Sequence, residues 1–442
     1  MVSDQSTDYR LFTERLAELV PFQEISCAAV ESRFTIRSRK IFPIEFLLTL
    51  IFGFYSKEEP SISKFHRIYN SIVDKEKQVV YSSFYDRFSN EGLAFVDKCL
   101  ENYISHQMSG INAELKGYLR TFKDVLIKDN TIVRVHSFLA NKYPATRTRR
   151  VTAGIKVSVL LSVVRNGPRS VKFFPEKTND AKTLTVGPWV NGMLLLMDRG
   201  FFKFDVFAKI VDYGGFFVTR IKSNTKAEVI SVGLGVPEKM RTRIIGQDIL
   251  KAIEIVSSNK LDIDARVTVR YFSNGEKKAK YPLELRFIAV YNEKTDEYNT
   301  YFTNIPEEEL AGRDVASLYA ARWDIENLFR EIKSENLLGR LKSKNDAITE
   351  IFIRIPIIRL IIARELFAVA RRILEPSVFI RLKKRSWAII FAENASQILR
   401  NLGKKKRGLR ATAPWREIWE TIVQGAISAH VNRKTHISNL YI

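Results

Sequence analysis

Cysteine and histidine are scarce in this sequence of 442 residues. The two cysteines, Cys27 and Cys99, lie far apart, and the five histidines follow no metal-binding spacing. Neither a disulfide framework nor a structural zinc site is supported, so both cysteines are expected to be buried thiols in a reducing compartment. A Walker-type phosphate-binding motif is also missing, and ATP is therefore not an expected ligand.

Uninterrupted hydrophobic runs long enough to cross a bilayer are missing as well. Residues 41–55 are too few and include Glu45. Residues 351–370 are enough in number, but four charged side chains interrupt them: Arg354, Arg359, Arg364 and Glu365. A charge at nearly every turn makes burial in lipid costly, so both stretches are predicted to be core helices. With no signal-peptide pattern in MVSDQSTDYR, we expect a cytoplasmic protein without a membrane partner.

Positive charge is what the sequence has in excess. It contains 71 Lys and Arg against 49 Asp and Glu, a formal net charge of +22. Such an excess favours a polyanionic partner, most often nucleic acid, although a generally basic soluble protein would have the same composition. The length leaves room for two to four structural units.

Hydrophobic periodicity divides the chain into regions of different character. Residues 1–115 and those after 311 have apolar positions at helical spacing, whereas strand-like runs separated by turn signals fill most of the interval between them. Basic residues are scattered through the N-terminal helices, which fits a small DNA-binding unit and a packing domain equally well.

Residues 319–333, YAARWDIENLFREIK, carry two kinds of side chain at helical spacing. On an α-helix, one arc of about 60° would hold Tyr319, Arg322, Glu326 and Lys333. A neighbouring arc would hold the apolar residues Leu318, Ala321, Ile325, Leu328, Phe329 and Ile332. Taken alone, the polar arc also fits a solvated surface with ion pairs between residues i and i+4.

Two aspartates follow apolar, strand-like runs elsewhere in the chain. Asp129 ends the run VLIKD, and Asp198 ends the run MLLLMD. A carboxylate beside a buried strand is costly unless it has a partner, and a divalent cation is such a partner. With Glu326 they would form an all-oxygen site suited to two Mg²⁺ or Mn²⁺ ions, which activate a water or a 3′-hydroxyl for attack on a phosphodiester. We therefore predict that Asp129, Asp198 and Glu326 are catalytic metal ligands.

These motifs resemble those of a known family. The spacing Y-x2-R-x3-E-x6-K, from Tyr319 to Lys333, resembles the signature of insertion-sequence transposases of the DDE superfamily, which include those of composite transposons. Asp129 is followed by Thr131, and Asp198 begins the sequence Asp-Arg-Gly-Phe, as the family pattern requires. The resemblance covers residues 120–340 well and the two ends only in general character.

The resemblance implies an α/β fold with a ribonuclease-H-like catalytic core interrupted by a β-rich insertion, and with helical N-terminal and C-terminal regions. The interval from Asp198 to Glu326 is 326 − 198 = 128 residues, which leaves room for the insertion. The predicted domains are a helical DNA-binding domain at 1–115, the core at 116–214 and 311–345, the insertion at 215–310, and a helical region with a candidate dimer contact at 346–442.

The resemblance also implies roles around the three acids. Arg322 and Lys333 would bind DNA phosphates, the first through its planar fork and the second as a point charge, and Tyr319 would donate a hydrogen bond there. Trp323, beside them in the sequence, would either pack on DNA or be a half-buried core residue.

Family members that form a DNA hairpin hold a flipped base on an aromatic side chain of the insertion. Tyr298 and Tyr301 are the candidates in this sequence, since the usual tryptophan is missing. Arg220 resembles a family arginine that would hold the displaced base or its phosphate, although a surface arginine at a strand edge fits as well.

Together these expectations describe a metal-dependent transposase that excises an insertion sequence and joins its 3′ ends to target DNA. Its partners would be double-stranded DNA, both the terminal inverted repeats and the target, and a second copy of the chain in a synaptic complex on a bacterial or archaeal nucleoid. Two alternatives remain: a ribonuclease-H-like nuclease without strand transfer, and an inactive DNA-binding regulator derived from a transposase. The intact acids argue against the second.

Overall fold

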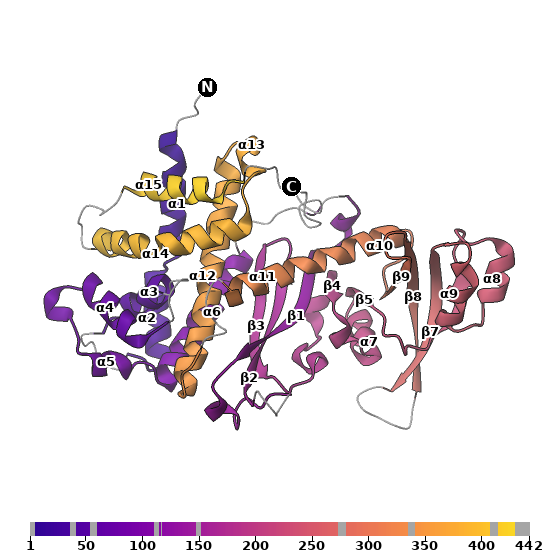
Figure 1. Ribbon diagram of the computed structural model, residues 1–442, viewed down its shortest axis with the longest axis horizontal. Helices are drawn as coiled ribbons and strands as arrows, with labels where there is room; N and C mark the ends of the chain where they lie inside the picture. The colour runs from indigo at the N-terminus through magenta and orange to yellow at the C-terminus, as the bar shows by residue number, and fades with distance from the viewer. Residues whose placement is uncertain are drawn as a thin grey trace.

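The computed structural model describes residues 5–35, 41–53, 60–109, 115, 117–146, 152–272, 280–334, 341–406 and 414–428. For residues 5–8, 272, 280, 324, 331–334, 405 and 406 it describes the backbone alone. The molecule is elongated, with helices gathered at one end and a sheet that runs toward the other end (Figure 1).

Two segments far apart in the sequence build the helical end. The first contributes α1 (Gln5–Glu18), α2 (Phe22–Glu31), α3 (Pro43–Gly53), α4 (Ile62–Ile72), α5 (Tyr81–Tyr85) and α6 (Asn90–Ser109). The second contributes α12 (Asp346–Ile373), α13 (Pro376–Phe379), α14 (Lys384–Lys406) and α15 (Trp415–Ala426). Helix α12 packs against α1, α3, α6 and α14. The N-terminal helices therefore have a packing role, while DNA binding by them stays a prediction.

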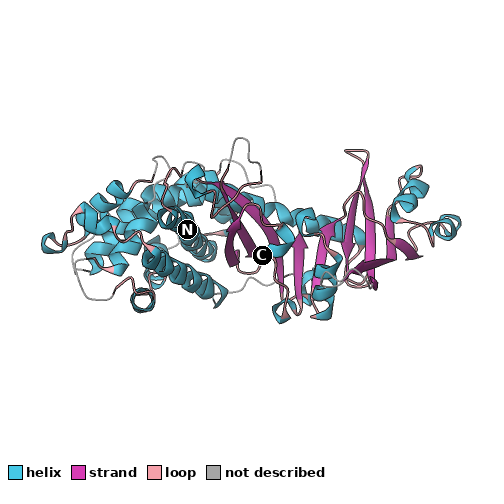
Figure 2. Cartoon of the chain, turned by 90° about the horizontal axis from the view of Figure 1, so that it is seen from below, coloured by secondary structure: helices cyan, strands magenta, loops and turns pink. Residues whose placement is uncertain are grey.

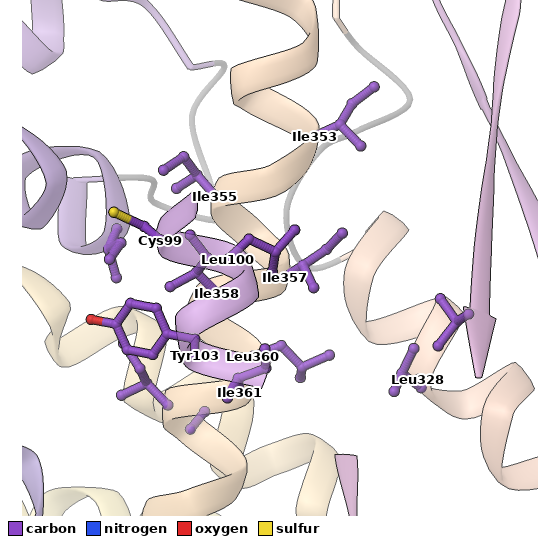
Figure 3. Packing of buried hydrophobic residues seen from close by; sticks show 14 of the residues in the cluster. Cys99, Leu100, Tyr103, Leu328, Ile353, Ile355, Ile357, Ile358, Leu360 and Ile361 are labelled. Carbon is purple, nitrogen blue, oxygen red and sulfur yellow. The ribbon is translucent and has the colours of Figure 1, made fainter. Parts of the chain in front are cut away.

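Helix α12 is buried along most of its length. Ile357, Ile358 and Ile361 of this helix lie beside Leu100 and Tyr103 of α6 (Figure 3). Because each fully buried isoleucine or leucine contributes about 1.5–3 kcal/mol, this contact holds the two helical segments together. Most of α12 is covered within the chain, and the dimer contact predicted for residues 346–442 stays a prediction.

The hydrophobic stretches that the sequence analysis assigned to core helices are confirmed as such where the structure describes them. They form the buried helices α3 and α12. In the described part of the chain, no helix combines the length and the apolar character needed to span a membrane.

The two cysteines differ in exposure. Cys99 of α6 is buried, as predicted, but Cys27 of α2 is exposed, so the prediction for Cys27 was wrong. Helix α2 turns Ile25, Ala28 and Ala29 toward the core, and at about 100° per residue position 27 then falls on the solvent side.

The sheet has nine strands in the order β3-β2-β1-β4-β5-β9-β8-β7-β6. Its core half consists of β1 (Asp124–Arg134), β2 (Gly154–Ser162), β3 (Gly167–Pro175), β4 (Met193–Met197) and β5 (Phe216–Arg220). Strands β1, β4 and β5 are parallel, β2 and β3 form an antiparallel hairpin beside β1, and α7 (Phe204–Asp212) links β4 to β5. This half is the predicted ribonuclease-H-like core, and the fold is mixed α/β with helical flanks.

The insertion continues the same sheet (Figure 2). It consists of β6 (Glu228–Val232), α8 (Glu238–Ile244), α9 (Ile249–Ser257), β7 (Ile263–Phe272), β8 (Lys280–Asn292) and β9 (Glu297–Thr303). Strand β9 pairs with β5, which itself pairs in parallel with β4. The predicted boundary at residue 215 therefore falls one strand too early, because β5 has the strand-like pattern of the insertion but belongs to the core.

The chain returns from the insertion to the core through α10 (Gly312–Tyr319) and α11 (Trp323–Ser334), which run across one face of the sheet (Figure 1). They are joined by a 3-10 turn, η7 (Ala320–Arg322), so the predicted single helix is interrupted. A 3-10 segment turns about 120° per residue, which rotates Tyr319 by about 60° relative to the expected arc. Further 3-10 turns are η1 (Lys75–Lys77), η2 (Gly117–Thr121), η3 (Ser137–Leu139), η4 (Asp180–Thr183), η5 (Pro188–Val190) and η6 (Arg199–Phe201).

Candidate active site

Asp129 and Asp198 lie side by side on two neighbouring parallel strands, Asp129 in the middle of β1 and Asp198 directly after the end of β4. Lys128 of β1 is in register with Met197 of β4, and each aspartate is the next residue in its chain. Neighbouring strands are about 4.8 Å apart, so the two carboxylates lie close together at the carboxyl end of β4. The carboxyl ends of parallel strands are where ligands generally bind in open α/β sheets.

Side-chain alternation places both aspartates on the face that α11 covers. Leu194 and Leu196 of β4 belong to the hydrophobic core beneath α11, whereas Leu195 and Met197 belong to the core on the opposite face. Because side chains alternate along an extended chain, Asp198 lies on the same face as Leu194 and Leu196. The same alternation in β1 places Asp129 with Ile127, which is also in the core beneath α11.

Helix α11 brings Glu326 to the two aspartates. The apolar arc predicted from the sequence is buried, with Ile325, Leu328 and Phe329 packed in the core and α11 in contact with β1. Glu326 follows Ile325 about 100° further around the helix, at the edge of this buried face, and is partly exposed. The structure thus brings together the three predicted acids, here called the acid cluster: Asp129, Asp198 and Glu326.

Arg322 bridges two members of the acid cluster. Its Nη2 donates to Glu326 Oε1 at 2.6 Å, and its Nη1 lies 3.3 Å from Asp129 Oδ2. Its Nε is buried and has no hydrogen-bond partner in the described part of the chain. The guanidinium therefore bridges two acids, and its Nε–H can still donate a hydrogen bond to a ligand.

The acids influence one another electrostatically. Burial, followed by smaller contributions from the negative charges of Asp198 and Glu326, raises the pKa of Asp129 to about 6, although the Asn130 amide and Arg322 act in the opposite direction. Perturbed carboxyls that face other carboxyls are typical of functional sites, because packing alone gives no reason to gather like charges.

Tyr319 is buried below the acid cluster. Its hydroxyl donates to the carbonyl oxygen of Met197 at 3.2 Å, directly before Asp198. Its ring lies 5.3 Å from that of Tyr301, and burial raises its pKa to about 12. In this arrangement Tyr319 supports the end of β4, and the hydroxyl predicted to contact phosphate is already bonded to the main chain.

The other predicted DNA contacts are spread around this site. Arg220 ends β5, its Nη2 donates to Asn299 Oδ1 at 2.5 Å, and its Nε is buried without a described partner. Tyr298 donates to the Leu261 carbonyl, and its ring packs on Tyr291. The Trp323 side chain is 58% exposed, so it is not a core residue. Lys333 belongs to α11, but its side chain lies outside the described residues.

A polar layer on the other face of the sheet was not predicted from the sequence. Asn130 and Lys156 both donate hydrogen bonds to Asp180 there, directly behind the acid cluster. The available signal was the polar run DNT that interrupts an apolar strand, together with an isolated lysine in the buried strand GIKVSVLLS.

The residue types of the acid cluster fit a divalent cation, but the side-chain positions are those of an ion-paired state. Carboxylate oxygens are the donors that Mg²⁺ and Mn²⁺ prefer. Within the described ranges, no three His, Cys, Asp or Glu side chains come close enough to share one metal ion. Arg322 links Asp129 to Glu326 instead, so a cation would replace this guanidinium as their common partner.

The sheet is ribonuclease-H-like, two of the acids belong to neighbouring parallel strands, and the third lies on a helix beyond an insertion. These features define a class: the DDE nucleotidyl-transfer fold that the motifs resemble. The Transposase DDE domain family matches residues 120–359. The chain belongs to this family of DDE transposases.

Individual relatives extend the match beyond the core. The transposase for insertion sequence element IS1151 of Clostridium perfringens is 23% identical over 367 residues, which cover 75% of each chain. The transposase for insertion sequence element IS231E of Bacillus thuringiensis subsp. finitimus is 22% identical over 360 residues, covering 74% of this chain and 73% of its own. A solved structure, the piggyBac transposase synaptic complex with hairpin DNA, has a TM-score of 0.41 and 12% identity, covering 97% of this chain and 86% of its own.

Proposed function

We propose that the protein is a DNA transposase that excises an insertion sequence and joins the 3′ ends of that element to target DNA. The observation that carries the proposal is the acid cluster: residues 129, 198 and 326, far apart in the chain, are near enough for two of them to raise the pKa of the third. Membership of the DDE transposase family supports the same activity.

The acid cluster would hold Mg²⁺ or Mn²⁺, two ions in each active site. When bound, the ions would act as Lewis acids that activate the attacking oxygen and stabilise the leaving oxygen. Asp129 and Asp198 would provide fixed ligands, because Asp129 lies within the paired strand β1 and Asp198 directly follows the paired strand β4. Glu326 would be released from Arg322 to serve as the third ligand, and Arg322 would then be free to bind a phosphate through its planar fork.

The chemistry is a hydrolysis of one phosphodiester followed by an exchange of one phosphate ester bond for another. In the first step, a water oxygen bonds to phosphorus at the element's end, and the bond to the 3′ oxygen breaks, which leaves a 3′-hydroxyl. In the second step, this 3′-hydroxyl bonds to a target phosphorus, and a target 3′-hydroxyl leaves. Arg322 and Lys333 would neutralise charge on the phosphate, and Arg220 would bind a neighbouring phosphate or displaced base.

Double-stranded DNA is the proposed partner, both as terminal inverted repeats and as target. The net charge of +22 favours such a polyanion, and exposed Trp323 beside Arg322 would pack on it. If a base is flipped, Tyr298 is better placed than Tyr301, since the latter is buried. Because two ends must be processed together, we propose that the chain acts as a homodimer in the synaptic complex, in the cytoplasm and on the nucleoid.

A strand-transfer assay tests this proposal. Purified protein, Mg²⁺ and a labelled element end taken from the DNA that flanks the gene should give a nicked end and then a joined product. Glu326→Gln should lower both rates by about 10³-fold, because a metal ligand contributes several kcal/mol to transition-state stabilisation. Cleavage without joining would favour a nuclease, DNA binding without cleavage would favour a regulator, and full cleavage by Glu326→Gln would refute the site.

A further inference from the structure

The polar layer behind the acid cluster is arranged around Asp180 of η4. Its Oδ1 accepts a hydrogen bond from Asn130 Nδ2 at 2.8 Å and from Lys156 Nζ at 2.6 Å. The Lys156 side chain is only 8% exposed and also donates to the carbonyl of Thr178. Asp180 is thus the shared acceptor for a residue of β1 and a residue of β2.

Asp180 also lies against the turn that carries Asp198. A Cβ atom added at Gly200 would lie 2.6 Å from Asp180 Oδ2 and 3.2 Å from Asp180 Cβ. The backbone of η6 therefore approaches the carboxylate more closely than any other residue type allows without movement. Gly200 is two residues beyond Asp198, and η4 and η6 are in contact.

Thr183, at the other end of η4, completes the link to β1. Its hydroxyl lies 3.2 Å from Asn130 Oδ1 and 2.7 Å from the carbonyl oxygen of Asp180. The amide of Asn130 is consequently bound at both ends by one short turn. Asn130 directly follows Asp129 and Gly200 is two residues beyond Asp198, so this turn contacts a residue close to each aspartate.

We propose that Asp180 is a positioning residue that sets the separation and orientation of Asp129 and Asp198. The register between β1 and β4 ends at Lys128 and Met197, so main-chain pairing between these two strands stops one residue before the two aspartates, while β1 stays paired with β2. Asp180 supplies the connection beyond that point, by binding Asn130 on one side and by packing on Gly200 on the other. The inference rests on the proposed metal-dependent function of the acid cluster.

The test uses the full-length protein with Mn²⁺ alone and, separately, with a labelled DNA end. Asp180→Asn keeps the size of the side chain but removes the charge that Lys156 requires. We expect Mn²⁺ affinity, followed by the electron paramagnetic resonance of the free ion, and the cleavage rate each to fall by about 10-fold to 100-fold. DNA affinity should change by less than about twofold, because no proposed DNA contact is touched.

Asp296→Asn is the matched control, since it removes an exposed carboxylate that pairs with Lys260 in the insertion. It should leave Mn²⁺ affinity and cleavage unchanged. Should Asp180→Asn fail to fold, Thr183→Val removes only the hydroxyl that orients Asn130 and should lower Mn²⁺ affinity several-fold. Wild-type Mn²⁺ affinity and cleavage rate in Asp180→Asn, or in Thr183→Val if that variant must decide, would overturn the inference. A wild-type protein that binds Mn²⁺ but cannot cleave DNA would instead refute the proposed function.

Discussion

Two clusters of charged side chains in this molecule differ in how their charges are paired. The first, here called the junction cluster, lies where the helical end meets the core: Asp97, Lys142, Tyr143, Asp346, Glu350 and Arg354. The second is the acid cluster with its single guanidinium. Both clusters are at least partly buried, yet only in the junction cluster does every charged side chain contact one of opposite sign.

In the junction cluster, charges of opposite sign are paired. Arg354 Nη1 lies 3.1 Å from Glu350 Oε2, and its Nε donates to Asp97. Lys142 Nζ lies 2.9 Å from Glu350 Oε1 and 2.7 Å from Asp346 Oδ2. The Tyr143 hydroxyl donates to Glu350, and burial raises its pKa above the ordinary value. A network satisfied in this way serves structure, because it connects α6, α12 and the core.

In the acid cluster, three carboxylates meet one guanidinium among the described side chains. The Asp198 carboxylate caps no main-chain amide of the turn that follows it, and Asp129 is held at a raised pKa of about 6. A fold gains nothing from such an excess of like charge. Burial of a charged side chain alone therefore does not indicate a functional site, whereas a partly buried charge without a partner of opposite sign does.

The largest effect on stability is expected in the junction cluster. Arg354→Met should lower the free energy of unfolding by about 3–5 kcal/mol, because Asp97 and Glu350 would remain without their common partner. Urea denaturation followed by circular dichroism measures this. Lys251→Met, which breaks an exposed pair with Glu254, should cost less than about 0.5 kcal/mol. Similar losses in both variants would mean that the junction cluster has no special structural role.

A smaller effect of opposite sign is expected in the acid cluster. Asp198→Asn should keep or raise the stability of the metal-free protein, with a gain of up to about 1 kcal/mol, because it removes repulsion against Asp129. Thermal unfolding in buffer containing a chelator measures this. Adding Mg²⁺ should then stabilise the wild type more than the variant. If Asp198→Asn instead lowered the free energy of unfolding by more than about 2 kcal/mol, Asp198 would have a structural role like that of the junction cluster.

Much of this contrast could be predicted from sequence, because it depends on local patterns. Apolar runs that end in a carboxylate identified Asp129 and Asp198, and helical spacing identified Glu326 and its buried apolar face. Charged residues inside an apolar stretch identified α12 as a core helix and excluded a membrane span, but they gave no sign that Arg354 would bind Asp97 of α6.

What could not be predicted depends on contacts between distant segments or on small differences in backbone geometry. The pairing of β9 with β5 has no local signal, so nothing in the sequence indicated that the insertion continues the core sheet. The 3-10 turn η7 differs from an α-helix by only about 20° per residue, yet it turns Tyr319 into the core. Asp180 lies in a loop whose sequence shows neither periodicity nor a motif, and its role is visible only once Asn130 and Gly200 are beside it.

The smallest effect is expected at a second aspartate of β1. Asp124 is buried like Asp129, but it is satisfied: it accepts hydrogen bonds from Ser162 Oγ at 2.5 Å and from the Val164 amide at 3.1 Å. Burial nevertheless raises its pKa above the ordinary value. A raised carboxyl pKa in the folded state favours folding while the group is protonated, and this contribution is lost as the pH rises through the folded pKa.

Asp124→Asn should therefore gain stability relative to wild type as the pH rises, since asparagine does not ionise, can accept from the Val164 amide through Oδ1 and can donate to Ser162 Oγ through Nδ2. Below the ordinary aspartate pKa of about 3.9, the two proteins should differ least, because both then carry a neutral side chain at this position. Urea denaturation at several pH values between about 4 and 7 measures the difference. Cleavage activity should be unaffected, because five residues of strand, about 17 Å, separate Asp124 from Asp129. If stability instead falls relative to wild type as the pH rises, the ionised Asp124 stabilises the fold. The buried charge of Asp124 would then be structural, whereas that of Asp129, on the same strand, would be functional.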